Sequence, residues 1–449
     1  MDKLIEGIVK GWREQIKEKE VGGLELVEEL FAYLLRLGQE VLQTLYEAIE
    51  EQIDNSTCTQ CQGATANRGR YEKTYRTRLG PVTVRRTERY CANCDTSAYA
   101  LDEFLGVGAQ ETETVDFKEW ICFHTQLSGS FQDTLDRLAH DYPYDLEPSQ
   151  VGRILEKVHQ WLEAADLPSK KPLQNAHRVY VGMDGILVRS CEPEQKFQEI
   201  KNAVIFSSVA EVSDGRKELL DKSYASTAGD VQAFQTRLED ACAARGVFSA
   251  EEVIVHGDGG EFIKTVTESG QLGWIARFGE KAKQRLIRIL DPYHLLEKFK
   301  LRLPQIVAVK AQAQLLISDC FERIWQAEDT SGLADVMQAI KALQPVSEAA
   351  QEAQRLLLGY LERNRDWIVP YKKYRAAGYI VSSGFVESGN YTTVAKRMKH
   401  KKARWTKDGA QNIVDLRVLH LNDQWERFFS RLSAIRVRWN FSQLAWRRI

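Results

Sequence analysis

Apolar residues recur at helical spacing in the first part of the chain. Between residues 24 and 53 there is no proline, and the apolar positions are Leu26, Leu30, Leu34, Leu37, Val41, Leu45 and Ile49. Residues three and four apart gather on one face of an α-helix. The pattern predicts a long amphipathic helix, or a pair of helices broken near Gly38, that packs against a neighbouring element or a second copy of the chain.

The pattern changes to strict alternation between residues 58 and 94. The segments YEKTYRTRL and VTVRRTERY alternate polar and apolar residues on either side of Gly80-Pro81. Alternation with period two around a Gly-Pro turn is typical of a β-hairpin. The tetrapeptides CTQC and CANC stand at the two ends of this hairpin.

These two CxxC steps indicate a structural zinc site. Four thiolates can close a tetrahedral Zn²⁺ site, and a hairpin brings its own ends together although the separation of the pairs is long. The predicted ligands are Cys58, Cys61, Cys91 and Cys94. The alternative is four unrelated buried cysteines. The isolated cysteines are expected to be buried apolar residues; they are Cys122, Cys191, Cys242 and Cys320.

Helical periodicity returns between residues 115 and 165. FQDTLDRLAHDY and PSQVGRILEKVHQWLEAA are joined by YPYDLEPS, and Ser149 is a plausible N-cap of the second helix. Two short helices with a tight connection are compatible with a DNA-reading helix-turn-helix and equally with a plain antiparallel pair. Both interpretations stay open.

Strand signals dominate after a linker at residues 167–172. RVYVGMDGILVRS, EIKNAVIFSSVAEVS and ELLDKSYAS are consecutive strand candidates, followed by the helix VQAFQTRLEDACAARG and the strand EEVIVHGDG. LIRILDPYHLLEKF is a short strand that runs into a helix, and residues 295–375 are helical throughout.

Charge is segregated along the chain, although the 449 residues have a formal net charge of only −2. Local charge decides phosphate binding because screening limits its reach to about 8–10 Å. The hairpin is basic, and residues 396–407 contain one acid-free cationic run. A solvated basic face is the alternative to DNA contact. The candidate DNA contacts are Arg70, Lys73, Arg76, Arg78, Arg85, Arg86, Lys396, Arg397, Lys399, Lys401, Lys402 and Arg404, with Arg436, Arg438, Arg447 and Arg448 as weaker candidates.

Several carboxylates stand at the ends of apolar strands. Asp184 lies in VGMDGILV and Asp258 in VIVHGDGGE, where an unpaired buried charge would cost several kcal/mol. Glycines around Asp258 allow the backbone to turn sharply. Either aspartate alone could simply cap a helix. Asp291 and His294 lie three residues apart where a strand becomes a helix, and Glu387 opens a helix before the cationic run.

This ordered set resembles the DDE transposases of bacterial insertion sequences, most closely the ISKra-type group and its Mutator-like relatives. The resemblance rests on Asp184-Gly, His-Gly-Asp258-Gly, Asp291-Pro-Tyr-His294 and Gly-Phe-Val-Glu387-Ser, and it spans nearly the whole chain. It implies that Asp184, Asp258 and Glu387 hold two Mg²⁺ (or Mn²⁺) ions. Asp291 and His294 match the family's C/D-x-x-H motif, whose histidine acts at the scissile phosphate.

The implied fold is a ribonuclease-H-like α/β core inside an α+β multidomain chain. Asp184 would lie on its first strand, Asp258 would follow the fourth, and Glu387 would lead the helix after a helical insertion. The expected divisions are an N-terminal helical region (1–55), a zinc ribbon (56–105), a helix-turn-helix-like region (106–170), the first segment of the core (171–299), an all-helical insertion (300–378), and the second segment of the core with a basic tail (379–449).

The implied activity is metal-dependent cleavage and strand transfer of DNA. The partners would be the terminal inverted repeats of a mobile element and a target duplex, and joining two ends requires a homodimer or larger assembly. The rival interpretations are a nuclease of the same fold and a zinc-ribbon DNA-binding protein with an inactive core. No run approaches a membrane span, and MDKLIEGIVKGWREQ lacks the apolar core of a signal peptide, so a bacterial cytoplasmic, nucleoid-associated location is expected.

Overall fold

The computed structural model describes residue 10 and residues 22–53, 56–142, 144–165, 172–173, 177–213, 216–268, 273–279, 285–400 and 403–432. The chain divides into two units. The first contains residues 1–124, 132–154 and 427–449, and the second contains residues 125–131 and 155–426. Residues 167–171 of the predicted linker lie outside the described residues, as do the weaker C-terminal arginine candidates.

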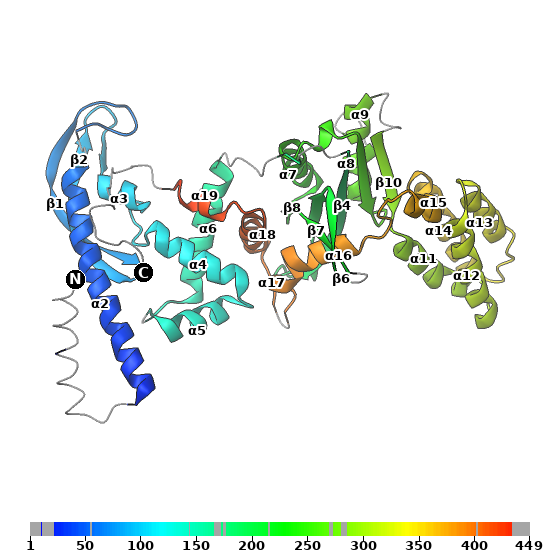
Figure 1. Cartoon of the computed structure of the whole chain (residues 1–449), viewed down its shortest axis with the longest axis horizontal. Coiled ribbons are helices and arrows are strands. Elements are labelled where there is room, and N and C mark those ends of the chain that lie inside the picture. Colours follow the sequence, from blue (N-terminus) through cyan, green and yellow to red (C-terminus); the bar gives the residue numbers. More distant parts are fainter. Residues whose placement is uncertain are drawn as a thin grey trace. The chain divides into compact units, whose positions relative to one another are not determined.

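The first unit is built on a long helix and a β-hairpin (Figure 1). The segment around Gly38 stays helical, so the alternative of two broken helices is excluded. Pairing of the strands runs from Thr65 opposite Cys91 to Thr77 opposite Gly80. The bounds are α2 Gly23–Gln52, β1 Thr65–Thr77, β2 Gly80–Cys91, β3 Thr96–Ala98, α3 Ala100–Leu105, α4 Val115–Leu127, α5 Phe131–Asp141, α6 Pro148–Ala164 and α19 Trp425–Phe429.

Helix α2 packs against the hairpin through its second half. Tyr46, Ile49 and Ile53 share a core with Tyr75, Val82 and other apolar residues of the hairpin and α3. Strand alternation explains this packing, because every second residue of β2 faces the helix. The first half of α2 leaves its apolar side exposed, including Leu24, Val27 and Leu34.

The helix pair predicted between residues 131 and 164 is present as α5 and α6. The prediction for its cap was wrong, because α6 begins at Pro148 and Ser149 lies inside its first turn. Proline is favoured at the first helical position, where its missing N–H costs nothing. The additional helix α4 precedes this pair.

The second unit is organised around a mixed five-stranded sheet with the order β10-β9-β4-β5-β8. Strand β4 pairs parallel with β9, and β9 pairs parallel with β10, whereas β5 is antiparallel to both β4 and β8. The strands are β4 Arg178–Arg189, β5 Phe197–Phe206, β8 Ser223–Thr227, β9 Glu252–Gly257 and β10 Leu286–Leu290.

Two of the three consecutive strand candidates are each divided into two strands. EIKNAVIFSSVAEVS forms β5 and then β6 Ser208–Ser213, and ELLDKSYAS contributes the end of β7 Arg216–Leu220 and then β8. Strands β6 and β7 pair with each other in a separate two-stranded sheet. Periodicity alone did not show where the chain leaves the large sheet.

Helices cover this sheet, and Figure 1 shows α16 lying across β4 and α7 beside β8. Asp230 caps α7 by accepting a hydrogen bond from the N–H of Ala233 at 2.8 Å, and Thr406 caps α18 in the same way. The bounds are α7 Val231–Ala244, η1 Val247–Ser249, α8 Glu261–Glu268, α9 Trp274–Phe278, α16 Gly384–Asn390, η4 Tyr391–Ala395, α17 Lys396–Met398 and α18 Lys407–Leu421.

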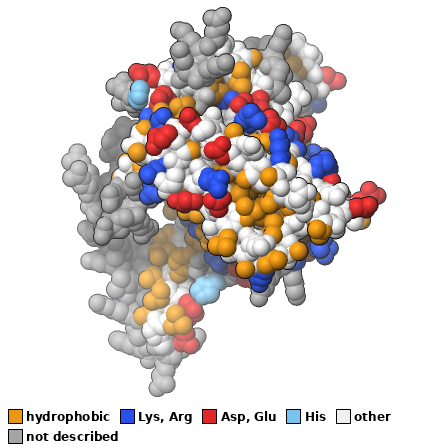
Figure 2. Space-filling model, turned by 90° about the vertical axis from the view of Figure 1, so that its right-hand side faces the viewer, with side chains coloured by type: hydrophobic (Ala, Val, Ile, Leu, Met, Phe, Trp, Pro, Cys, Tyr) orange, Lys and Arg blue, Asp and Glu red, His pale blue; other side chains and the backbone are white. Residues whose placement is uncertain are grey.

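The predicted helical segment between the strands and α16 is present. It begins earlier than residue 300, because α11 starts at Pro292, and its buried side chains share one core with the sheet. Its bounds are α11 Pro292–Ile306, α12 Lys310–Gln326, α13 Ser331–Lys341, α14 Glu348–Arg363, η3 Arg365–Trp367 and α15 Tyr371–Ala376. Figure 2 shows hydrophobic side chains gathered on one face among mixed charges.

The described helices include none with both the length and the apolarity that a membrane crossing needs.

Candidate functional site

The four predicted zinc ligands come together in the first unit. Among the described residues they form the only group of three or more His, Cys, Asp or Glu whose ligand atoms all lie within 4.8 Å of one another. The sulfur atoms of Cys61 and Cys91 are 3.5 Å apart, and those of Cys58 and Cys94 are 3.9 Å apart. Four converging thiols suit a tetrahedral Zn²⁺ site.

The turns that carry these thiols have the backbone shape of metal knuckles. Gln62 follows Cys61 with φ 59°, and Asp95 follows Cys94 with φ 51°, so each pair ends in a left-handed turn. The backbone N–H of Gly63 lowers the pKa of Cys61 to about 7, whereas hydrogen bonding to Cys61 raises the pKa of Cys94 to about 12. Cys61 and Cys94 thus hold their protons unequally, and a divalent cation would allow both thiols to ionise.

Three of the four isolated cysteines are buried, as expected. Cys122, Cys242 and Cys320 are buried, but Cys191 is exposed, so the prediction for Cys191 was wrong. Cys191 follows the end of β4, where its N–H bonds the carbonyl of Trp405 at 2.9 Å and its side chain points outside the core.

Part of the positive charge on the hairpin is neutralised within the first unit. Lys73 Nζ lies 3.0 Å from Oδ2 of Asp102, and Arg86 also pairs with this buried carboxylate. Tyr75 donates a hydrogen bond to the other Asp102 oxygen at 2.6 Å. Asp102 is therefore a structural anchor, and Lys73 and Arg86 hold the hairpin against α3 instead of presenting two open charges.

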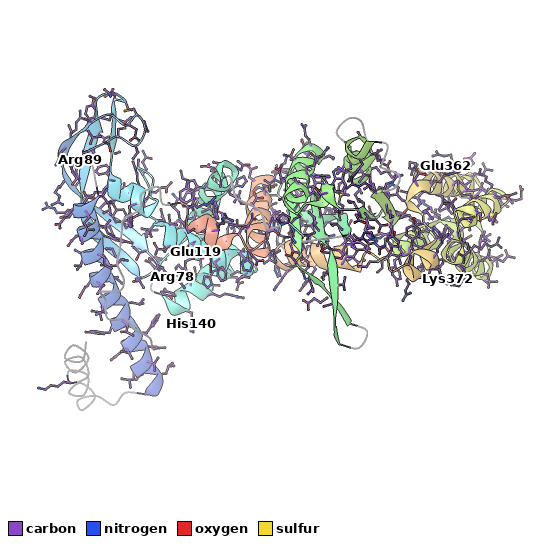
Figure 3. The ribbon with its side chains drawn as sticks, turned by 45° about the horizontal axis from the view of Figure 1, so that its top comes forward. Arg78, Arg89, Glu119, His140, Glu362 and Lys372 are labelled. Atoms are coloured by element: carbon purple, nitrogen blue, oxygen red, sulfur yellow. The ribbon has the colours of Figure 1, made fainter. Side chains whose placement is uncertain are left out.

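Other basic residues of the hairpin face solvent. Arg70, Arg78 and Arg85 are exposed, and Arg85 makes only a 3.4 Å surface pair with Glu72. Arg76 is half-buried, 3.8 Å from Glu113. Figure 3 labels Arg78, in the turn of the hairpin, and Arg89, near its cysteine end. The exposed arginines are those that remain available to an anionic partner.

The cationic run after Glu387 is only partly exposed. Lys396, Lys399 and Arg404 face solvent, whereas Lys401 and Lys402 lie outside the described residues. Arg397 departs from the expectation of a DNA contact. It is buried to 1% exposure and donates hydrogen bonds to the carbonyl oxygens of Thr125 and Gly129, each at 2.8 Å. Trp405 is in the core.

Three acidic residues lie at one edge of three neighbouring parallel strands: Asp258 and Asp291 directly follow β9 and β10, and Asp184 lies within β4 just beyond its pairing with β9. The expectation that Asp184 stands at a strand end was wrong, because β4 continues beside β5 as far as Arg189. The β4–β9 register ends with Gly182 opposite His256, so two further residues on each chain lead to Asp184 and Asp258. Asp291 directly follows β10, and its N–H bonds the carbonyl oxygen of Gly257 at 3.0 Å. The carboxyl ends of parallel strands meet at one edge of a sheet and commonly form the site in open α/β folds.

The Asp258 turn depends on glycine. Gly259 has φ 83°, and an added Cβ there would lie 2.5 Å from Oδ1 of Asn364. The N–H of Gly260 bonds Oδ1 of Asp258 at 2.8 Å, which fixes the carboxylate at the mouth of the turn. A side chain at residue 259 would therefore strain the backbone and push against the helical insertion.

Asp184 is the most perturbed carboxyl of this edge. Its Oδ1 accepts a hydrogen bond from the N–H of Gly185 and its Oδ2 one from Asn390 Nδ2, both at 2.7 Å. Burial, and next the negative charge of Asp258, raise the pKa of Asp184 to about 6. Each of these two aspartates lies two residues beyond the last β4–β9 pair, so a cation bound at this edge would relieve the repulsion between their charges.

Asp291 and His294 form an ion pair at the start of α11. His294 Nδ1 lies 2.9 Å from Oδ2 of Asp291, and the same oxygen accepts a hydrogen bond from Ser383 Oγ. The other oxygen, Oδ1, accepts a hydrogen bond from the N–H of Tyr293. Burial alone would raise the pKa of Asp291, but these hydrogen bonds lower it. The bond to Asp291, helped by the charges of Asp258 and Asp184, raises the pKa of His294 to about 9.

The His294–Asp291 pair is expected to make stability depend on pH. The pKa of His294 is about 9 in the folded chain, against about 6.5 unfolded, so protonation favours folding. The stabilisation should be complete below about pH 6.5 and should disappear as pH rises through about 9, amounting to about 2 kcal/mol after screening. Urea unfolding of the wild type and His294→Gln at pH 6, 8 and 10 measures it. A difference in the free energy of unfolding between wild type and His294→Gln that stays constant with pH would contradict the ion pair.

Glu387 lies on a helix that is attached to the same edge, but its side chain is exposed. Phe385 and Val386 fill the space above Gly182, where an added Cβ would lie 2.4 Å from each of them. Asn390, one helical turn after Glu387, reaches Asp184. Among the described residues the three predicted acids are not gathered within 4.8 Å as the cysteines are. Helix α16 therefore brings Glu387 to the strand that carries Asp184, without closing a metal cluster.

Sequence reasoning missed the amides around Asp184. Asn202 on β5 is fully buried and donates to Asn390 Oδ1 at 3.0 Å, and Ser226 on β8 donates to Asn202. The chain of hydrogen bonds therefore runs from Ser226 through Asn202 and Asn390 to Asp184. A polar residue inside the apolar strand EIKNAVIF was a visible signal, because such a residue needs a buried partner.

No protein-family model matches this chain, and no curated protein matches it either.

Proposed function

We propose that this chain is a DDE-type DNA transposase, which binds the ends of a mobile element and performs metal-dependent cleavage and strand transfer. The observation that carries the proposal is the edge of the five-stranded sheet. There Asp184 lies on β4 beyond its pairing with β9, Asp258 follows β9, and the Asp291–His294 pair follows β10. The charge of Asp258 raises the pKa of both Asp184 and His294. Perturbed titratable groups gathered at a strand end are characteristic of functional sites.

The topology supports a ribonuclease-H-like core. In chain order, β4 is the first strand of the five-stranded sheet and β9 is the fourth, and the two are parallel neighbours. Asp184 lies on β4, and Asp258 directly follows β9. Glu387 is in the first turn of α16, after the helical segment. These are the positions that the resemblance requires for the three carboxylates.

The donor atoms of the edge suit hard divalent cations. Mg²⁺ prefers carboxylate oxygens and usually takes one or two of them, with water and phosphate completing its shell. Asp184, Asp258 and Glu387 would hold the ions, and Asn390 would keep one Asp184 oxygen in a fixed direction. Bound ions would stabilise the attacking and leaving oxygens of a phosphodiester.

At this edge the protein itself supplies a proton from His294 and holds the histidine ring in a fixed orientation. His294 keeps its proton up to about pH 9 because Asp291 holds its Nδ1, so the other ring nitrogen carries an N–H that can donate to a phosphate oxygen. Ser383 and the N–H of Tyr293 hold Asp291 in turn. These contacts orient the histidine before DNA arrives, which lowers the entropic cost of catalysis.

Contact with duplex DNA is proposed for the exposed cations. Arg70, Arg78 and Arg85 on the hairpin and Lys396, Lys399 and Arg404 after α16 face solvent. Phosphate contacts release counterions, so affinity should fall steeply with salt. The buried Arg397 and the paired Lys73 and Arg86 are excluded from this role as they stand, because their charges are already engaged inside the protein.

The test uses the purified full chain, Mg²⁺ and a DNA fragment that carries its gene with both flanks. A transposase should nick at both flanks and join the freed 3′ ends to a second DNA, and sequencing of the products reads both events. Cleavage without joined products would establish the rival nuclease. Salt-sensitive binding without cleavage in Mg²⁺ or Mn²⁺ would establish a DNA-binding protein with an inactive core, which the exposed position of Glu387 favours as second candidate.

A further inference from the structure

The second unit contains a cavity of 770 Å³ on the far side of α16 from Asp184. Gly384, Phe385, Ser388 and Gly389 line it along one face of α16, whereas Asn390 turns toward Asp184. The other walls come from β7 and β8, the start of α11, Trp325 of α12, and the segment from Arg375 to Ser382. Its size lies in the range of small-molecule and nucleotide sites, about 300–1,000 Å³.

One aromatic ring of the lining is open to solvent. Tyr293 is 64% exposed, whereas Tyr224 is buried, and Trp325, Tyr379 and Phe385 are half-buried. Trp325 stacks on Tyr371 with ring centroids 5.7 Å apart. The ring of Tyr379 is covered by Arg178 at 3.7 Å, and its hydroxyl bonds Glu252 at 2.9 Å. Tyr293 thus offers a flat face to an incoming planar group, next to walls that are already fixed.

One exposed cation of the lining can meet an anionic group. Arg375 lines the cavity and faces solvent. Tyr293 is the residue before His294, and Ser388 is the residue after Glu387. Two residues of the lining are therefore direct sequence neighbours of groups that the proposed function places at the scissile phosphate.

We infer that this cavity takes one unpaired nucleotide of a DNA strand near the cut, with its base stacked on Tyr293 and its phosphate near Arg375. Stacking of a base on an aromatic side chain is largely independent of base identity, because every base has a π-face. The role near the cut rests on the proposed function, whereas the capacity to bind an unpaired base does not.

The experiment compares two fluorescein-labelled ten-nucleotide strands, oligo(dT) and an abasic strand with the same phosphates, by anisotropy without divalent cations. The wild-type full chain should bind oligo(dT) about 10-fold more tightly than the abasic strand. Tyr293→Ala should bring this ratio close to one while leaving the abasic affinity unchanged. Tyr391→Ala is the matched control, because Tyr391 is 60% exposed in the same unit and does not line the cavity.

A second measurement locates the base. A strand with one 5-iododeoxyuridine should form a photo-crosslink in the peptide that contains Tyr293, and the crosslink should be lost in Tyr293→Ala. An unchanged ratio in Tyr293→Ala, an equal loss for both strands, or a crosslink only elsewhere would overturn the inference.

The outcomes separate the two proposals. If the chain cleaves and joins DNA but the ratio of its affinities for oligo(dT) and the abasic strand does not depend on Tyr293, only the nucleotide-site inference is overturned. If this affinity ratio depends on Tyr293 but the chain never cleaves DNA, the proposed function is overturned and the nucleotide site remains.

Discussion

Replacing Asp258 by asparagine is expected to lower the rate of DNA cleavage by about 10³-fold or more while DNA binding stays close to that of the wild type. Asparagine keeps the shape of the side chain but removes one of the charges that would hold divalent cations. The loss of a metal-stabilised transition state is worth several kcal/mol, and each 1.36 kcal/mol is a factor of ten in rate. Single-turnover cleavage in Mg²⁺ measures the effect.

A second consequence of Asp258→Asn does not depend on activity. The charge of Asp258 contributes to the raised pKa of Asp184, so this pKa should fall below about 6 in the variant. Carboxyl titration by NMR would detect the change. The matched control is Glu251→Gln, which removes an exposed carboxylate beside the opposite end of β9. Wild-type cleavage by Asp258→Asn, or an equal loss in Glu251→Gln, would contradict the assignment of Asp258.

Replacing Cys91 by serine is expected to abolish zinc binding and to unfold the hairpin end of the first unit. Cys91 is 2% exposed and ends β2, where its sulfur lies 3.5 Å from that of Cys61. Structural Zn²⁺ sites bind with about 10–16 kcal/mol in small zinc modules, so the loss of one thiolate removes a large share of local stability. Elemental analysis should fall from one zinc per chain to near none.

The readout for folding is amide hydrogen exchange in β1, β2 and β3. Protection of these strands should collapse in Cys91→Ser, whereas the five-stranded sheet of the second unit should keep its protection. Cys191→Ser is the control, since Cys191 is exposed and outside the cluster. Full zinc content in Cys91→Ser would show that the four cysteines are not the ligand set.

The local features of this chain were open to prediction because they depend on residues close in sequence. Periodicity of 3.6 located α2, α5, α6 and the helices from α11 to α15, and alternation located the hairpin. The zinc cluster followed from spacing, because a hairpin must bring its own two ends together. The position of Asp258 after an apolar strand was visible in the local pattern as well, whereas Asp184 lies inside β4 and not at its end.

Burial and partners of single residues were not open to prediction in this way. Lys73, Arg86 and Arg397 look like phosphate contacts in the sequence, yet Asp102 and two backbone carbonyls engage them. Their partners lie 16 to 272 residues away in the chain. The spacing of a basic run does not indicate such a partner, because the sequence pattern is the same whether the side chains face solvent or are engaged inside the fold. The predictions for the burial of Cys191 and the capping position of Ser149 were wrong because both residues lie close to the end of an element. The exact end of an element is not visible in the periodicity of the sequence.

By itself, the sequence of this protein determined most of the helical and strand segments, where four thiols meet, and the position of Asp258 and Asp291 after apolar strands. Each of these depends on the local period of the side chains or on a turn of a few residues. Only the tertiary structure decided the order of the five strands, the division that creates β6 and β7, and the contact of Asn390 with Asp184 across 206 residues. The physical reason is that strand register and buried hydrogen bonds depend on which distant segments pack together in one core. Such long-range packing leaves no periodic pattern in the sequence.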